Sequence, residues 1–418
     1  MLLRFRVANT RSFRDEQELS FVADPQAAPS VAQVVELSSG TALMVHPVIG
    51  VFGANASGKS NLLAALSDMR RAVLDSYALW PTYAGVPRDP FKLEAKHKAE
   101  TSFAEVDFVV DAVRYTYGYE LADDHVAGEW LHAYPAGRKQ VWFDRDATRE
   151  RKFDFKGNRL GPRSVTDALA RRTRRDALFL TVAYTDNHPQ LSPFYAWFRD
   201  NLWMIDPEVD RADREAFTER ELKGARGERI RELLAVADLG ISDVLTEVDE
   251  GGRTTIRLLH RGADGNIPFD WSQESFGTRS WFALLGPILL ALDSGAVVMV
   301  DELDSSLHPG FAAEIVRLFT DPEVNTTGAQ LLFTSHDATL LGDRDTHRLL
   351  GPDQVWLTVK DREGATELYP LSDADPGPNE DLERSYLLGR FGGVPRISQG
   401  QVGRRLRASK AEGLRKRA

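Results

Sequence analysis

The stretch VIGVFGANASGKSNLL, residues 48–63, decides the fold. An apolar run over residues 48–53 leads into the pattern G-x-x-x-x-G-K-S at residues 53–60, and a helix is predicted from about Ser60 to Ala78. A glycine-rich loop between a strand and a helix directs backbone N–H groups and the helix N-terminus toward one point. The stretch therefore predicts a site for the phosphates of a nucleotide, with an unliganded turn as the alternative.

The residue types of this loop predict how the nucleotide is held. Gly53 and Gly58 allow the backbone to curl around the β-phosphate, Lys59 supplies positive charge to the β- and γ-phosphates, and the Ser60 hydroxyl is a ligand for Mg²⁺. The expected cofactors are therefore ATP and Mg²⁺. The residues of this loop that we expect to contact them are Gly53, Asn55, Ser57, Gly58, Lys59, Ser60 and Asn61.

Two later strands end in the polar residues that such a site needs. The apolar run at 297–300 ends in Asp301, expected to hold magnesium, and Glu302, expected to act as the base or to orient the attacking water. The strand at 330–334 precedes His336, whose imidazole can face the γ-phosphate. We therefore predict Lys59, Glu302 and His336 as catalytic residues, and Ser60 and Asp301 as metal ligands.

Changes in pattern divide the chain into four segments. Residues 1–160 contain the glycine loop and a β-rich lobe, and residues 161–250 show the periodicity of a helical insertion. Strand signals return over residues 251–372, and residues 373–418 form a tail with a basic end. The predicted fold class is α/β, with a mixed-sheet core, an antiparallel β-lobe and a helical insertion.

Composition restricts the class of protein. The chain has 418 residues, no cysteine and a formal net charge of −10. Disulfides and thiolate metal sites are therefore excluded, and no apolar run reaches the roughly 18 residues of a membrane span. We expect a cytoplasmic protein with no membrane partner. Nucleic acid remains a possible partner only through local basic patches.

Three segments carry open interpretations. The basic run RRTRR at 171–175 and the basic tail at 403–418 either contact a polyanion or are simply solvated. The aromatic stretch at 194–203 is expected in the core, with base stacking as the alternative. A further hypothesis places the turn at 9–13 beside adenine, with Arg11 or Phe13 in contact.

Together these motifs resemble the ATPase head of the ABC superfamily, in the branch of RecF, SMC and OLD-like proteins. VFGANASGKSNLL resembles its Walker A motif, VVMVDELDSSLHP its Walker B motif and D-loop, and FTSHD its switch-histidine segment. The small ATPases described as AAA15 and AAA21, which include components of abortive-infection and phage-defence systems, look closest. SYLLGRFGGVPRI is similar to their C-terminal region.

The resemblance implies roles for further residues. Asp304 takes the place of the D-loop aspartate, and ESFGTR at 274–279 resembles the signature motif that a second subunit supplies. Ser275, Gly277 and Thr278 would then contact the nucleotide of the partner, in a homodimer or a higher even oligomer. One departure is the coupling glutamine, because Thr185 stands in the stretch where it is expected, and Gln140 and Gln190 are poor substitutes.

The implied function is an ATP-hydrolysing switch that controls a separate, nuclease-like effector in anti-phage defence. Only 82 residues follow His336, which we expect to be too few for a nuclease domain of its own. The main alternative is a RecF-like, DNA-binding ATPase of repair or recombination. A transporter subunit and a scaffold that holds ATP without hydrolysis are further alternatives, and Glu302 counts against the scaffold.

Overall fold

The computed structural model describes most of the chain. The described residues are 1–23, 32–206, 209–236, 240–248, 254–263, 265–305, 307–344, 347–377, 379–394, 403–405 and 407. Most of the basic tail, including Lys410, Arg415, Lys416 and Arg417, lies outside them. The interpretation of that tail as a polyanion contact therefore stays a prediction.

A six-stranded mixed sheet forms the centre of the fold. Its order is β11-β15-β16-β5-β19-β20, with β20 antiparallel and the other strands parallel. The strands are β11 (Leu202–Ile205), β15 (Val297–Val300), β16 (Gln330–Ser335), β5 (Val48–Gly53), β19 (Val355–Lys360) and β20 (Thr366–Pro370). Every residue of β5, β15 and β16 is buried, as their unbroken apolar runs predict.

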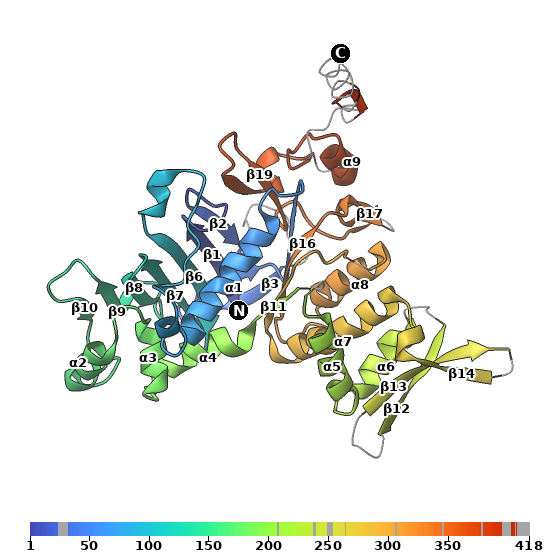
Figure 1. Ribbon diagram of the computed structural model, residues 1–418, viewed down its shortest axis with the longest axis horizontal. Coiled ribbons are helices and arrows are strands. Elements are labelled where there is room, and N and C mark those ends of the chain that lie inside the picture. Colours follow the sequence, from blue (N-terminus) through green and yellow to red (C-terminus); the bar gives the residue numbers. More distant parts are fainter. Residues whose placement is uncertain are drawn as a thin grey trace, which may run out of the picture.

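A seven-stranded antiparallel sheet forms the predicted β-lobe, in the order β10-β9-β8-β7-β6-β1-β2. Its strands are β1 (Leu2–Ala8), β2 (Gln17–Ser20), β6 (Ser102–Val110), β7 (Val113–Leu121), β8 (Val126–Ala133), β9 (Gln140–Asp146) and β10 (Phe153–Phe155). Helix α1 (Lys59–Asp75) packs against this lobe through Leu62, Leu66 and Met69. Figure 1 shows α1 between the lobe and the central sheet.

The other face of the central sheet is covered by α7 (Phe276–Ser294) and α8 (Pro309–Thr320). Residues of β5 pack on both faces of the sheet. Ile49 and Val51 belong to the hydrophobic core shared with the β-lobe and α1, and Val48 and Phe52 belong to the core shared with α7 and α8. Strand β5 is thus buried on both faces. The glycine loop at its end is consequently held between two packed cores.

The predicted helical insertion at 161–250 is wrong as a single unit. Helices α2 (Arg163–Arg172), α3 (Phe179–Thr185) and α4 (Ser192–Asn201) come first, but β11 then enters the central sheet beside β15. The reason is its apolar sequence LWMI, which pairs residue by residue with VVMV. Helices α5 (Arg211–Leu222) and α6 (Gly227–Val236) pack against α7 instead.

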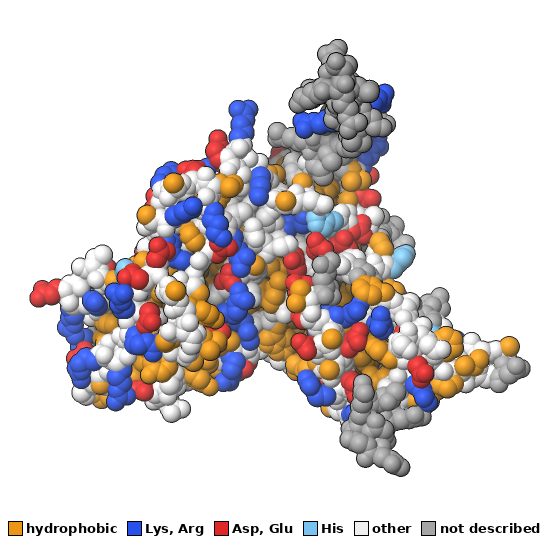
Figure 2. All heavy atoms as spheres, in the orientation of Figure 1, with side chains coloured by type: hydrophobic (Ala, Val, Ile, Leu, Met, Phe, Trp, Pro, Cys, Tyr) orange, Lys and Arg blue, Asp and Glu red, His pale blue; other side chains and the backbone are white. Residues whose placement is uncertain are grey.

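A small antiparallel sheet precedes α7. It consists of β12 (Ile241–Val248), β13 (Thr254–Gly262) and β14 (Gly265–Asp270), and Figure 1 shows it projecting from the helices. Every residue of β14 is exposed. Figure 2 shows hydrophobic side chains at the surface of this projection.

The structure shows the surroundings of the basic run at 171–175 and of the aromatic stretch at 194–203. Phe194, Trp197 and Phe198 are buried and pack around Phe108, so the aromatic stretch is core, as expected. The basic run forms ion pairs within the chain, with Arg172 to Asp186, Arg174 to Asp176 and Arg175 to Asp124. Figure 2 shows basic and acidic side chains interspersed in this part of the surface.

The short helix α9 (Leu382–Leu387) closes the described C-terminal part of the fold. Its Tyr386 packs edge-on against Phe52 of β5, and Gly393 lies close to Gly53. The segment SYLLGRFGG thus packs against the junction between β5 and the glycine loop. Among the described residues, no helix combines the length and the apolar character that crossing a bilayer requires.

Candidate functional site

The glycine loop at 53–60 joins β5 to α1 in a space that admits no larger residue at two positions. A Cβ atom on Gly53 would lie 2.4 Å from Thr358 Oγ1, and one on Gly58 would lie 2.3 Å from Thr366 Oγ1. Gly58 also caps α1 with a φ of 117°, which disfavours any side chain. Both glycines are therefore fixed by contact with β19 and β20.

Side-chain hydroxyls of β19 and β20 form hydrogen bonds with the glycine loop. Ser57 Oγ lies 2.6 Å from Thr358 Oγ1, and Thr366 Oγ1 donates to the Ser57 carbonyl oxygen at 2.8 Å. Asn61 donates through Nδ2 to Ser12 Oγ at 2.8 Å. Ser57 is buried within this frame, whereas Asn55 is exposed at the tip of the loop. Of these two predicted contacts, only Asn55 faces outward.

Lys59 lies inside the curve of the loop. Its Nζ donates to the carbonyl oxygens of Gly53 at 2.9 Å and Ala54 at 3.3 Å, and lies 3.3 Å from His336 Nδ1. Burial lowers the pKa of Lys59 to about 8, although the carboxylates of Glu302, Asp301 and Asp304 oppose this effect. The loop thus holds a cation that a phosphate would stabilise.

Asp301 joins the two halves of the site. Its Oδ1 accepts hydrogen bonds from Ser60 Oγ at 3.0 Å and from Thr334 Oγ1 at 2.6 Å. A hydroxyl and a carboxylate side by side next to a phosphate loop are the oxygen ligands that Mg²⁺ uses with nucleotides. Within the described part of the chain, no group of three or more histidine and acidic side chains is placed so that it could hold a metal ion.

Glu302 and His336 face each other beside Lys59. Glu302 adopts a φ of 49°, a backbone conformation that costs about 1–3 kcal/mol for a residue other than glycine. Its N–H donates to Thr334 Oγ1 at 2.7 Å, and its Oε1 lies 3.4 Å from His336 Nε2. His336 therefore lies between the Lys59 ammonium and the Glu302 carboxylate. The strained backbone turns that carboxylate toward the loop.

Asp304 supports this arrangement from the turn after β15. Its Oδ1 accepts a hydrogen bond from the His336 N–H at 3.2 Å. Within one chain, Asp304 therefore positions the histidine segment.

The predicted signature residues lie at the start of α7. Ser275 is the N-cap, and its Oγ accepts from the Thr278 N–H at 3.0 Å and lies 2.8 Å from Thr278 Oγ1. Gly277 follows in the first turn. Among the described residues, no hydrogen bond or ion pair joins Ser275 or Thr278 to the glycine loop.

Several residues of the site were missed from sequence. Thr334 bridges Asp301 and Glu302, and Thr358 and Thr366 close the loop from β19 and β20. The signal for Thr334 was its position two residues before His336. The two later threonines lie about 300 residues from the loop, and no local pattern marks them.

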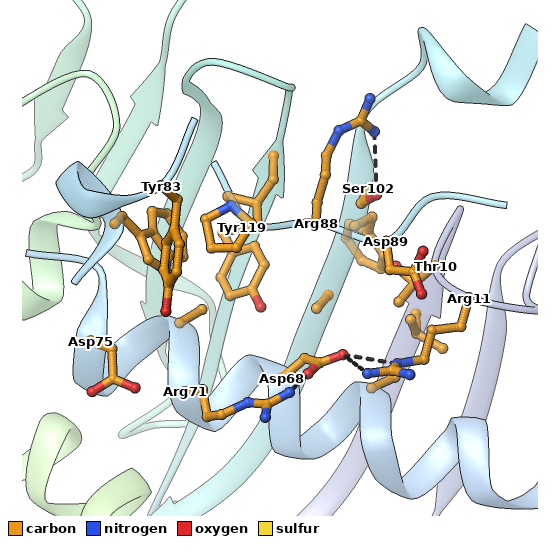
Figure 3. A pocket seen from close by; sticks show the side chains of 18 residues that line it. Thr10, Arg11, Asp68, Arg71, Asp75, Tyr83, Arg88, Asp89, Ser102 and Tyr119 are labelled. Atoms are coloured by element: carbon orange, nitrogen blue, oxygen red, sulfur yellow. Dashed lines mark hydrogen bonds and ion pairs between the residues drawn. The ribbon is translucent and has the colours of Figure 1, made fainter. Parts of the chain in front are cut away.

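The hypothesis about adenine is wrong for Phe13, which is fully buried and cannot touch a base. Arg11 forms an ion pair with Asp68 (Figure 3) and is partly exposed, and its contact with adenine stays a prediction. The coupling glutamine also has no counterpart among the candidates. Thr185 donates to the Thr181 carbonyl oxygen within α3, and neither Gln140 nor Gln190 has a described bond to the loop.

Comparison with known proteins identifies the family. Residues 48–342 match the protein-family model described as "AAA domain, putative AbiEii toxin, Type IV TA system". Among solved structures, the chain is similar to the SMC head domain from Thermotoga maritima, at 14% identity over 88% of this chain and 98% of that chain, with a TM-score of 0.40. The chain is also similar to an SMC head bound to the C-winged helix domain of ScpA, at 15% identity over 90% of this chain and 99% of that chain, with a TM-score of 0.40. No curated protein matches the chain.

The lowered pKa of Lys59 predicts how nucleotide affinity depends on pH. Only the charged ammonium attracts phosphate, and its fraction falls as pH rises through about 8. ATP affinity, measured by calorimetry, should fall about 10-fold between pH 7 and pH 9, as expected for a group with this pKa. Lys59→Arg keeps its charge over this range and serves as the control. Constant wild-type affinity across the range would contradict the assignment.

Proposed function

The chain belongs to the AAA-domain family whose model matches residues 48–342, and on that premise we propose that it binds ATP with Mg²⁺ and hydrolyses it. The observation that carries the proposal is the convergence of Lys59, Ser60, Asp301, Glu302 and His336 around one loop. Lys59 and Ser60 begin α1 after the loop that follows β5, and the other three residues follow β15 and β16, which are neighbours of β5 in the central sheet.

Each side chain has a distinct task in this proposal. Lys59 exchanges its contacts with loop carbonyl oxygens for the β- and γ-phosphates, and its pKa rises in response. Glu302 orients the attacking water and accepts its proton. His336 Nε2 lies 3.4 Å from Glu302 Oε1 and its Nδ1 lies 3.3 Å from Lys59 Nζ, so the imidazole links the base to the phosphate cradle.

The metal would be held by Ser60 and Asp301 together with the phosphates. When bound there, Mg²⁺ neutralises negative charge on the phosphate oxygens. Thr334 fixes the Asp301 carboxylate through its hydroxyl, so the ligand keeps its orientation before the metal arrives.

We further propose that two chains share two ATP molecules, each held between one glycine loop and the Ser275, Gly277 and Thr278 of the other chain. Two features support this arrangement. Ser275 and Thr278 make no described contact with their own loop, and the neighbouring Phe276 is 50% exposed at the start of α7. The N-terminus of α7 offers N–H groups that suit a γ-phosphate.

Mixing two inactive variants tests this sharing. Lys59→Ala removes the loop cation, and Ser275→Ala removes the cap that the other chain supplies. An equal mixture forms mixed dimers with one intact site, so phosphate release should recover to about a quarter of the wild-type rate. Mixing Lys59→Ala with Glu302→Ala is the control, because both changes affect the same half-site and each mixed-dimer site stays defective. No recovery in the first mixture would contradict the shared site.

The output proposed for hydrolysis is a conformational change that controls a separate effector in anti-phage defence. The description of the matched family, which refers to a toxin of a toxin–antitoxin system, supports this role. The alternative, a RecF-like DNA-binding ATPase, receives little support from the basic run at 171–175. Three of its arginines form ion pairs with aspartates of the same chain.

A phage challenge tests the defence role. Cells that carry the gene with its neighbouring genes should lower the plating efficiency of at least one phage. Lys59→Ala should abolish that protection, because the switch then cannot bind ATP. Lys156→Ala, a change on the exposed surface of the lobe, should leave it intact. Protection that persists in Lys59→Ala, or its absence against a broad phage panel, would count against the role.

A further inference from the structure

The motif SYLLGRFGGV at 385–394 takes no part in the proposed chemistry, yet it packs against the glycine loop. We call residues 380–394 the C-terminal strap, which contains α9 and the turns that follow it. Figure 1 shows α9 in the upper part of the molecule, beside β19. Leu382, Tyr386 and Phe391 of the strap are buried in the same hydrophobic core as Phe52 of β5. The strap is therefore a packed part of the fold next to the site.

Tyr386 connects the strap to the first residue of the glycine loop. Its ring packs edge-on against Phe52, with ring centroids 6.4 Å apart, and its hydroxyl donates to the Gly393 carbonyl oxygen at 3.3 Å. Burial raises the pKa of Tyr386 to about 12, and a hydrogen bond from the Gly53 N–H to the phenol oxygen opposes this rise. The protonated hydroxyl thus bridges the strap and the loop.

Gly53 is held at both of its backbone polar groups. Its N–H donates to Tyr386, and its carbonyl oxygen accepts from Lys59 Nζ at 2.9 Å. Gly393 lies so close that a Cβ atom on it would be 3.6 Å from Gly53 Cα and 3.3 Å from Tyr386 Cε2. A movement of the strap would therefore move the residue that Lys59 contacts.

The strap also contacts the segment 336–342, which begins with His336. The 3₁₀ helix η4 (Ala338–Leu341) belongs to this segment, and α9 packs against it. Glu383 of α9 lies against Gly342, where a Cβ atom would be 2.5 Å from Glu383 Oε2. The glycine loop and the segment that carries the histidine thus contact the same strap.

Two further bonds hold the strap itself. Tyr369 of β20 donates through its hydroxyl to the Phe391 carbonyl oxygen at 2.9 Å. Glu380 accepts a charged hydrogen bond from Arg390 Nη1 at 2.5 Å. Neither bond involves Tyr386, so the strap keeps both when the Tyr386 hydroxyl is removed.

From these contacts we propose that the strap positions the glycine loop and the segment 336–342 for ATP, and that Tyr386 is a positioning residue that acts through Gly53. This inference rests on the proposed ATPase function. Without the hydroxyl, the Gly53 N–H loses its acceptor, and the loop that holds Lys59 becomes less rigid. ATP should then bind more weakly, because the loop has to be ordered when the nucleotide binds.

The first test removes only the hydroxyl. Tyr386→Phe keeps the ring against Phe52, and its ATP affinity, measured by calorimetry with Mg²⁺, should fall about 3- to 10-fold, the effect of one lost hydrogen bond. Tyr195→Phe is the matched control. The Tyr195 hydroxyl likewise donates to a backbone carbonyl oxygen, that of Leu74 at 3.2 Å, but lies outside the strap. Its removal should leave the affinity unchanged.

A second pair of variants separates displacement of the strap from backbone strain. Gly393→Ala, at a φ of 72°, places a methyl group against Tyr386 and Gly53. Gly157→Ala adds the same group at a φ of 68°, with no other atom of the described residues within 4 Å of it. Gly393→Ala should weaken ATP binding at least as much as Tyr386→Phe, and Gly157→Ala should not weaken it.

Hydrogen exchange followed by mass spectrometry tests the strap without nucleotide. Residues 49–60 should exchange faster in Tyr386→Phe, and Gly393→Ala should also speed exchange over 336–342. Wild-type protein that binds no ATP would contradict the proposed function, whereas faster exchange would still support the contact between strap and loop.

Three results would overturn the inference. The first is exchange at the wild-type rate in these peptides of Tyr386→Phe and Gly393→Ala. The second is faster exchange with unchanged ATP affinity in both variants. The third is an equal loss of ATP affinity in the two control variants.

Discussion

The hydrogen bonds that meet at Asp301 Oδ1 hold the site together. This one oxygen accepts from Ser60 at the start of α1 and from Thr334 at the end of β16, while Asp301 itself follows β15. Three segments far apart in sequence are thereby fixed within about one hydrogen-bond length of each other. Thr334 also accepts from the Glu302 N–H, so the strained φ of Glu302 is stabilised by the same contacts.

The regular parts of the fold could be predicted because their patterns are local. The buried strands at 48–53 and 297–300, the β-meander and the glycine loop all show in short stretches of sequence. The strand LWMI at 202–205 was missed because four apolar residues after a helical pattern carry no signal of their own. Only pairing with VVMV, about 95 residues later, makes this stretch a strand.

The site could be predicted to the same extent. Residues that belong to contiguous motifs lie together: Lys59 is in the curve of the glycine loop, and Asp301 accepts a hydrogen bond from Ser60 beside it. Ser57 faces the frame of the loop instead of its outer surface, because Thr358 of a distant strand supplies a closer hydrogen-bond partner. Phe13 was a poor candidate for contact with adenine because burial of its apolar ring in the core is favourable, and the ring is fully buried there. Such outcomes depend on long-range packing, which a motif does not encode.

The proposed function depends most on Glu302 as the group that activates water in a site shared by two chains. The most direct measurement compares Glu302→Gln with wild type by mass in solution, with and without ATP and Mg²⁺, and follows phosphate release in the same samples. We predict that Glu302→Gln releases no phosphate and that ATP holds it as a dimer or larger even assembly. Unchanged phosphate release by a strict monomer would contradict both the base and the shared site.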